Sequence, residues 1–148
     1  MKDTFFYRNV KDSDSLLISE WLGDKKLNQF LSSAFRKKHS KIFIKILFKK
    51  KDNLWYVFGN NKKIIGCVIL DSIDHTDRIA NIWYLNSNKN MHRKNLTYRA
   101  ISQIIKLNEL NLNSLIAWTL DSNFKSIKLL KKLKFKKIGE IEKTFFFK

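Results

Sequence analysis

The loop over residues 86–95 has the composition best suited to chemistry in this chain. It carries the basic or potentially basic side chains Lys89, His92, Arg93 and Lys94. An amphipathic pattern begins directly after it, so the loop leads into the N-terminus of a helix. Unpaired backbone N–H groups and the helix dipole attract anions at such a position. The sequence therefore predicts a site for a phosphate-bearing ligand.

The elements on either side of the loop are predicted from their apolar patterns. Residues 78–85 are β-branched and aromatic over the length of a strand. From residue 96 the apolar side chains recur at helical spacing, which predicts a helix over residues 96–110. Residues 114–120 predict another strand. Strand, helix and strand in this order make the two strands parallel neighbours joined by a right-handed crossover.

The loop resembles that of the GNAT superfamily of acyl-CoA-dependent N-acyltransferases. His92 to Thr97 occupy the six places of the family pattern Gln/Arg-x-x-Gly-x-Gly/Ala, with Asn95 and Thr97 at the glycine positions. Asn adopts left-handed φ more easily than most residues, so Asn95 suits its place. The preceding strand is similar to the branch that acetylates protein N-termini, ribosomal proteins among others. The resemblance implies that the loop amides bind the pyrophosphate of coenzyme A.

A second segment resembles the same family. Residues 123–135 follow the pattern N-x-x-[SA]-x-x-L-Y-x-K-x-G-F, with matches at Asn123, Ser126, Leu129, Lys132 and Phe135. The tyrosine that often protonates the departing thiolate is replaced by Leu130, and the glycine by Lys134. The resemblance assigns Asn123 to the cofactor arm, while its place before a helix also suits N-capping.

The resemblance implies acetyl-CoA as co-substrate, and we expect no metal. The residues expected to bind it are Tyr84, Leu85, His92, Arg93, Lys94, Asn95, Leu96, Thr97, Asn123 and Ser126. The chain has no CxxC or HxxxH motif that would predict a zinc site.

Acetyl transfer to an amine needs a backbone donor for the thioester carbonyl and a base for the amine proton. The resemblance places the donor in the strand before the loop, near residues 84–85. We expect Glu20 as the base, with Asp71, Asp74 and His75 as alternatives. Tyr98 or Ser126 is expected to assist the departing thiolate.

The remaining chain predicts α/β (α+β) architecture in a single GNAT-like domain over residues 1–148. Strands are expected at residues 4–10, 54–58 and 64–70, and one bent strand or two short strands at 136–148. Helices are expected near residues 12–23 and 27–31. The pattern of residues 40–51 fits either a strand or a helix, and the resemblance to the GNAT family favours the helix. The resulting fold is a mixed, mostly antiparallel sheet of six to seven strands flanked by about four helices.

The chain of 148 residues is strongly basic. Lys and Arg number 30 against 13 Asp and Glu, a net charge of +17. Such a chain attracts polyanions, although Lys-rich, Pro-free composition is also what codon bias in an AT-rich genome produces. The single cysteine, Cys67, fits a reducing compartment. No apolar run has the length of a membrane span and no signal peptide is evident, so we expect a cytoplasmic protein.

Two functions follow from these observations. The first is an N-acetyltransferase that acts on a primary amine, either a protein N-terminus or an amino sugar, as a monomer or homodimer. The second is a catalytically impaired GNAT-fold protein whose Lys-rich face binds RNA or an acidic partner.

Overall fold

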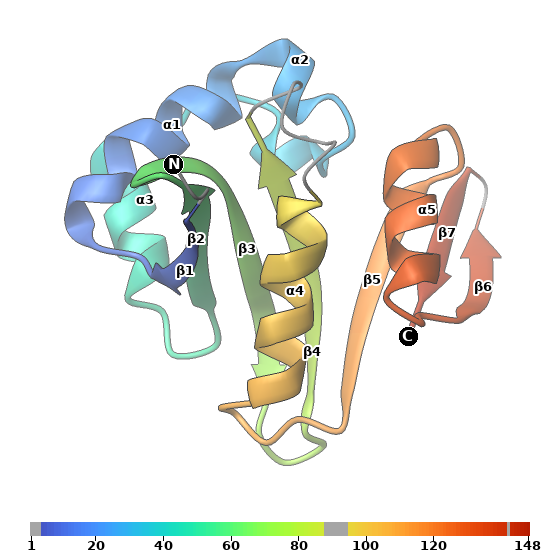
Figure 1. Ribbon diagram of the computed structural model, residues 1–148. Helices are drawn as coiled ribbons and strands as arrows, with labels where there is room; N and C mark the ends of the chain where they lie inside the picture. The colour runs from blue at the N-terminus through green and yellow to red at the C-terminus, as the bar shows by residue number, and fades with distance from the viewer. Residues whose placement is uncertain (1–3, 88–94, 142) are drawn as a thin grey trace.

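A seven-stranded sheet forms the centre of the computed structural model, which describes residues 4–87, 95–141 and 143–148. The strand order is β1-β2-β3-β4-β5-β7-β6 (Figure 1). Among the described strands only β4 and β5 pair in parallel, and all other neighbours are antiparallel. The mixed, mostly antiparallel sheet predicted from the sequence is confirmed.

The elements have the following bounds. The strands are β1 (Phe5–Asn9), β2 (Leu54–Asn60), β3 (Lys63–Asp74), β4 (Ile79–Asn86), β5 (Ser114–Leu120), β6 (Lys137–Ile141) and β7 (Thr144–Phe147). The helices are α1 (Ser15–Gly23), α2 (Lys25–Asn28), α3 (Lys41–Phe48), α4 (Leu96–Leu107) and α5 (Phe124–Lys132), with short 3-10 turns at Asp12–Asp14 and Ser33–Phe35. No helix in the described parts of the chain is long and apolar enough to span a membrane.

Helices cover both faces of the sheet, and each face has its own apolar core. On one face α1 and α3 pack against β2, β3 and β4, while α4 and α5 pack on the other. Side chains alternate along a strand, so β4 contributes to both cores. Trp83 and Leu85 join the α1/α3 core, and Ile82 and Tyr84 join the α4/α5 core.

The helix predicted over residues 40–51 is confirmed as α3. The Ser40 side chain accepts a hydrogen bond from the Phe43 N–H at 3.2 Å and so caps the helix. Ile44 and Leu47 are buried and lie three residues apart, on one helical face. Burial of this face decides between the two patterns that the sequence allowed.

Several predicted boundaries were wrong. The short second helix ends at Asn28, before residues 29–31. The helix predicted to reach residue 110 ends at Leu107, because Asn108 adopts a left-handed φ of 43°. Strand β3 extends to Asp74, beyond the predicted end at residue 70, so Asp71 and Asp74 lie in a strand.

The parallel pair β4 and β5 is joined only at its start. Ile79–Asn81 pairs with Ser114–Ile116, and in the described part of the chain the pairing ends there. Beyond this point β5 diverges from β4 and pairs with β7 instead (Figure 1). The remainder of β4 therefore borders an opening in the sheet.

Candidate active site

A groove of about 730 Å³ lies at the opening between β4 and β5. Its described lining comes from Asp71 of β3, β4 from Asn81 on, the start of α4, the end of β5, one side of α5, and the segment that includes α2 and the loop after it. We call this space the groove. It joins the two segments in which the sequence predicted site residues.

The N-terminus of α4 opens onto the groove. Asn95 has the left-handed φ of 52° that the glycine position requires, as its residue type allowed. Leu96 is buried in the core, and Thr97 accepts a hydrogen bond from the Asn86 side-chain amide at 3.0 Å. First-turn N–H groups of a helix have no intrahelical partner, so those of α4 are available to an anion. His92, Arg93 and Lys94 lie outside the described residues.

Two hydroxyl groups meet across the opening. The Tyr84 phenol, from β4, is hydrogen-bonded to the Ser126 hydroxyl, from α5, and both residues line the groove. Asn123 accepts a hydrogen bond from the Ser126 N–H at 3.3 Å and caps α5. Burial raises the pKa of Tyr84 to about 12, although the hydrogen bond to Ser126 works against this rise. The phenol is therefore protonated at neutral pH.

The side chain of Leu130, which stands where the family has a tyrosine, is buried in the core. Leu130 is 1% exposed and packs between α5 and the sheet. Ser126 lies one helical turn before Leu130 on the same face of α5. The Tyr84 phenol thus lies one turn from the place of the family tyrosine, although it comes from another element. Tyr98, the other predicted hydroxyl, lines the groove beneath Lys132, whose ammonium is 4.4 Å from the centre of its ring.

A carboxylate and an aromatic wall border the groove on the α1/α3 face. Asp71 accepts a hydrogen bond from the Trp83 indole N–H at 2.8 Å. The Phe35 ring packs against Trp83 with 4.8 Å between ring centres. Among the described residues that line the groove, Asp71 is the only carboxylate. Glu20, the expected base, has an exposed side chain on α1 and is not part of that lining.

The structure brings most of the described site residues together. Those that line the groove are Tyr84, Leu85, Asn95, Leu96, Thr97, Tyr98, Asn123 and Ser126. Sequence reasoning missed the Tyr84 hydroxyl, Trp83 and Phe35. The antiparallel register of β3 and β4 could have predicted the contact between Asp71 and Trp83. Asp71 pairs with Asn81, and Trp83 lies two residues further along β4 on the same face.

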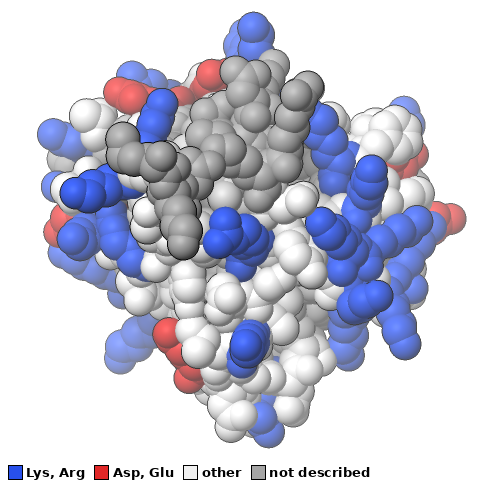
Figure 2. All heavy atoms as spheres, viewed as in Figure 1, with Lys and Arg blue, Asp and Glu red and all other residues white. Residues whose placement is uncertain are grey.

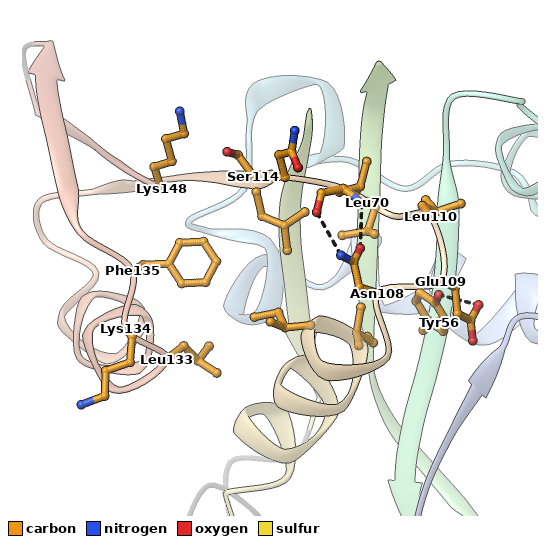
Figure 3. Close-up of a pocket in the computed structure, with 15 residues that line it drawn as sticks. Tyr56, Leu70, Asn108, Glu109, Leu110, Ser114, Leu133, Lys134, Phe135 and Lys148 are labelled. Atoms are coloured by element: carbon orange, nitrogen blue, oxygen red, sulfur yellow. Dashed lines mark hydrogen bonds between the residues drawn. The ribbon is translucent and has the colours of Figure 1, made fainter. Parts of the chain in front are cut away.

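A smaller cavity of about 270 Å³ lies near the C-terminal ends of α4 and α5 (Figure 3). Phe135 points into it, while the Lys134 ammonium points away. Tyr56 donates a hydrogen bond to Glu109 at 3.4 Å, and burial together with this carboxylate raises the pKa of Tyr56. None of the predicted site residues that the structure describes lines this cavity.

Basic side chains cover much of the face seen in Figure 2. Among the described residues, four lysines line the groove itself: Lys26, Lys125, Lys128 and Lys132. The last three recur on one side of α5, at spacings of three and four residues. The described part of the chain contains no group of three or more His, Cys, Asp and Glu side chains that could hold a metal ion.

Comparison with known proteins identifies the class. The profile of the acetyltransferase (GNAT) domain family matches residues 5–136, and the chain belongs to this family. A search of curated protein sequences finds no match. The predicted co-substrate, acetyl-CoA, is the one that GNAT acetyltransferases use, and this prediction is confirmed at the level of the family. The ribosomal-protein branch stays a prediction.

Solved structures confirm the fold. A domain from Methanocaldococcus jannaschii DSM 2661 is similar, with a TM-score of 0.84 at 17% identity over 99% of this chain and 97% of that one. Spermidine N-acetyltransferase from Vibrio cholerae, in complex with CoA and spermine, superposes with a TM-score of 0.75 at 16% identity over 97% of this chain and 92% of that one. A mutant of the same enzyme gives 0.77 at 17% identity, covering 96% and 92%.

Proposed function

We propose that this protein transfers an acetyl group from acetyl-CoA to a primary amine. The observation that carries the proposal is the groove between the diverging strands β4 and β5, with the α4 N-terminus on one side and the Tyr84–Ser126 pair across it. The similar enzyme from Vibrio cholerae acts on an amine, as its name states, which supports an amine acceptor. The sequence resemblance favours a protein N-terminus or an amino sugar.

The groove divides into two functional parts. The first turn of α4, with Lys125 and Lys128 nearby in the lining, would hold the coenzyme phosphates. Backbone N–H groups of β4 near Tyr84 and Leu85 would donate to the thioester carbonyl, where negative charge develops. The bound co-substrate supplies an activated acetyl group, and positioning against the amine accounts for much of the remaining rate.

The Tyr84 hydroxyl would stabilise the departing sulfur. Its pKa of about 12 lies above the value of roughly 8.5 typical of a thiol. Full proton transfer from the phenol to the sulfur is therefore unfavourable, whereas a hydrogen bond to the developing negative charge is favourable. Ser126 holds the phenol at the opening. The neutral amine loses one proton as the amide forms, and the departing thiolate takes up one proton to become the free thiol.

Asp71 would receive the amine. The Trp83 indole holds one of its oxygens at 2.8 Å, which fixes the carboxylate at the wall of the groove. A carboxylate there can orient the ammonium group, which loses one proton to solvent before its nitrogen attacks, and can then accept the second proton as the C–N bond forms. We propose this role for Asp71 in preference to Glu20, because Glu20 does not line the groove.

The proposal is tested by acetyl-CoA binding to two matched variants of α4. Thr97→Glu places a carboxylate in the groove beside the phosphate position, while acidic residues at a helix N-terminus favour the helix. Gln103→Glu makes the same charge change on the same helix at an exposed residue outside the groove. Titration calorimetry should show at least about tenfold weaker binding for Thr97→Glu and little change for Gln103→Glu.

Desulfo-CoA serves as an inert ligand, and transfer is then measured with a panel of amines. Equal affinities of the two variants, or binding that disappears at raised salt, would contradict the proposal. In that case only the net charge of +17 would attract the phosphates.

RNA binding is a second candidate function. Phe124 and Trp118 are 75% and 39% exposed beside the lysines of α5, and aromatic side chains among basic ones suit stacking of single-stranded bases. Binding of an unstructured RNA that falls when both aromatic residues are replaced by Ala would favour this candidate.

A further inference from the structure

We infer that the acceptor carries a single amine next to an apolar group and has negative charge on its remainder, so that polyamines are poor substrates. This inference rests on the proposed acetyltransferase function and concerns the acceptor half of the same groove. Three observations support it: the number of carboxylates in the described lining, the aromatic wall beside Asp71, and the positive charge of residues 24–45, which contribute to that wall.

The described lining of the groove has one carboxylate for a cation. Asp71 is the only acidic side chain among the described residues that line it, against four lysines. One oxygen of Asp71 already accepts the Trp83 indole N–H. A single ammonium group can be neutralised at this carboxylate, whereas further ammonium groups would be repelled by the lysines of the described lining and would find no second carboxylate among its residues.

The wall beside Asp71 is aromatic. Phe30 and Leu31 line the groove with Phe35 and Trp83, and each of these side chains is half-buried. The Phe35 and Trp83 rings are packed at 4.8 Å, so the wall is formed without a ligand. Such a surface suits an apolar side chain next to the amine.

The segment that provides this wall is strongly basic. Residues 24–45 contain seven Lys and Arg and only one acidic residue, Asp24. The Asp24 carboxylate accepts the Lys26 N–H at 2.8 Å and caps α2, so it faces its own helix. Lys26 lies in the lining of the groove. Charge complementarity therefore favours an acceptor that is negative beyond its amine.

Spermidine lacks these properties, because it is an unbranched chain with several positive charges. The similar Vibrio cholerae structures are named for spermidine N-acetyltransferase. The shared fold leaves the acceptor open, since the acceptor depends on side chains that differ at 16–17% identity.

The experiment measures acceptor binding to the CoA-loaded protein, which needs no turnover. Three peptides begin with phenylalanine and continue with two aspartates, two glutamines or two lysines, and spermidine is the fourth ligand. Calorimetry should give the order acidic, neutral, basic, with about tenfold or more between the acidic and basic peptides at low salt. Acetylation rates should follow the same order.

Two charge variants identify the source of the preference. Lys26→Gln/Arg36→Gln removes two charges from the acceptor segment, and Lys63→Gln/Lys106→Gln removes two exposed charges outside the lining. The first variant should reduce the ratio of acidic to basic affinity several-fold, and the second should leave it nearly unchanged. Each variant should have the same melting temperature as the parent protein, which shows that the substitutions leave the fold intact.

Equal peptide affinities, preferred binding of spermidine, or equal effects of the two variants would overturn the inference. Failure of the proposed function would differ from this, since it would appear as loss of selective CoA binding in the Thr97→Glu comparison. A protein that acetylates spermidine efficiently would keep the proposed function and refute the inferred acceptor.

Discussion

Tyr84 shows how the place of one side chain can compensate for a change in another element. The family pattern has a tyrosine where this chain has the buried Leu130. Strand β4 contributes Tyr84 from the opposite side of the opening, and its hydroxyl meets Ser126 one turn earlier on α5. A hydroxyl is thus present at the opening although the α5 tyrosine is absent.

Tyr84→Phe removes this hydroxyl and keeps the ring. We expect kcat to fall by about tenfold to a hundredfold, because a hydrogen bond to a developing charge contributes about 1.5–3 kcal/mol. The affinity for acetyl-CoA and the melting temperature should change little. Steady-state kinetics at saturating acetyl-CoA give the measurement. Tyr98→Phe is the matched comparison, and a loss confined to Tyr98→Phe would assign the role to that residue instead.

Asp14 connects α1 to the first strand through a partly buried ion pair with Arg8. Its carboxylate accepts hydrogen bonds from both terminal nitrogens of Arg8, at 2.8 and 3.0 Å, and from the Lys11 N–H at 2.7 Å. Burial alone would raise the pKa of Asp14, but these hydrogen bonds are strong enough to hold it below the usual value. The group therefore stabilises the fold above its unfolded-state pKa, and this contribution is lost as the pH falls through the folded-state pKa.

Asp14→Asn should reduce the free energy of unfolding by about 1–3 kcal/mol near neutral pH, because it removes the charge and leaves Arg8 without its carboxylate. Below roughly pH 4 the difference from the parent should shrink, since the parent carboxylate also becomes protonated. Urea unfolding at several pH values measures both quantities. A difference that is constant with pH would show that the charge on Asp14 does not contribute.

The end of α5 shows how an element can adopt its usual geometry without its usual residue. The Phe135 N–H donates to the Leu130 carbonyl and the Lys134 N–H to the Lys131 carbonyl, both at 3.0 Å, which is the Schellman arrangement. Lys134 occupies the left-handed position with a φ of 69°. Phe135 and Leu130 are both buried, as the apolar contact of this motif requires.

Lys134→Gly should stabilise the protein by about 1 kcal/mol, because glycine adopts left-handed φ without the steric cost that a side chain adds. The ammonium group points away from the cavity, so little contact is lost (Figure 3). Thermal or urea unfolding measures the gain. Lys136→Gly removes a similar charge at a residue without positive φ and should give no gain. Destabilisation by Lys134→Gly would mean that contacts of the lysine side chain contribute more free energy than the left-handed φ costs.

Patterns within one element were predictable, and relations between elements were not. The start of the helix at residue 96 followed from apolar periodicity, and the left-handed φ of Asn95 from residue type. The divergence of β4 and β5 depends on β7 as the other partner of β5, which no local pattern contains. For the same reason the contact of Tyr84 with Ser126, 42 residues away, required the structure.

At the scale of the whole molecule, the net charge of +17 has two components that the structure separates. Lysines spread over the surface raise the local concentration of any polyanion, and this effect falls steeply with salt. Lys125, Lys128 and Lys132 instead lie together in the lining of the groove, where they can contact one bound ligand. Lys131 and Lys136 are exposed close by but do not belong to that lining.

These neighbours allow a comparison at constant net charge. Lys125→Gln/Lys128→Gln should weaken acetyl-CoA binding several-fold more than Lys131→Gln/Lys136→Gln, because contact with a phosphate is worth more than a diffuse potential. Calorimetric titrations at low and raised salt measure both variants. The difference between them should persist at raised salt, since a close ion pair in a groove is screened less than exposed charges are. Identical losses in the two variants that vanish together at raised salt would instead assign the lysines of α5 to general polyanion attraction, and would leave the α4 N-terminus as the feature that selects the co-substrate.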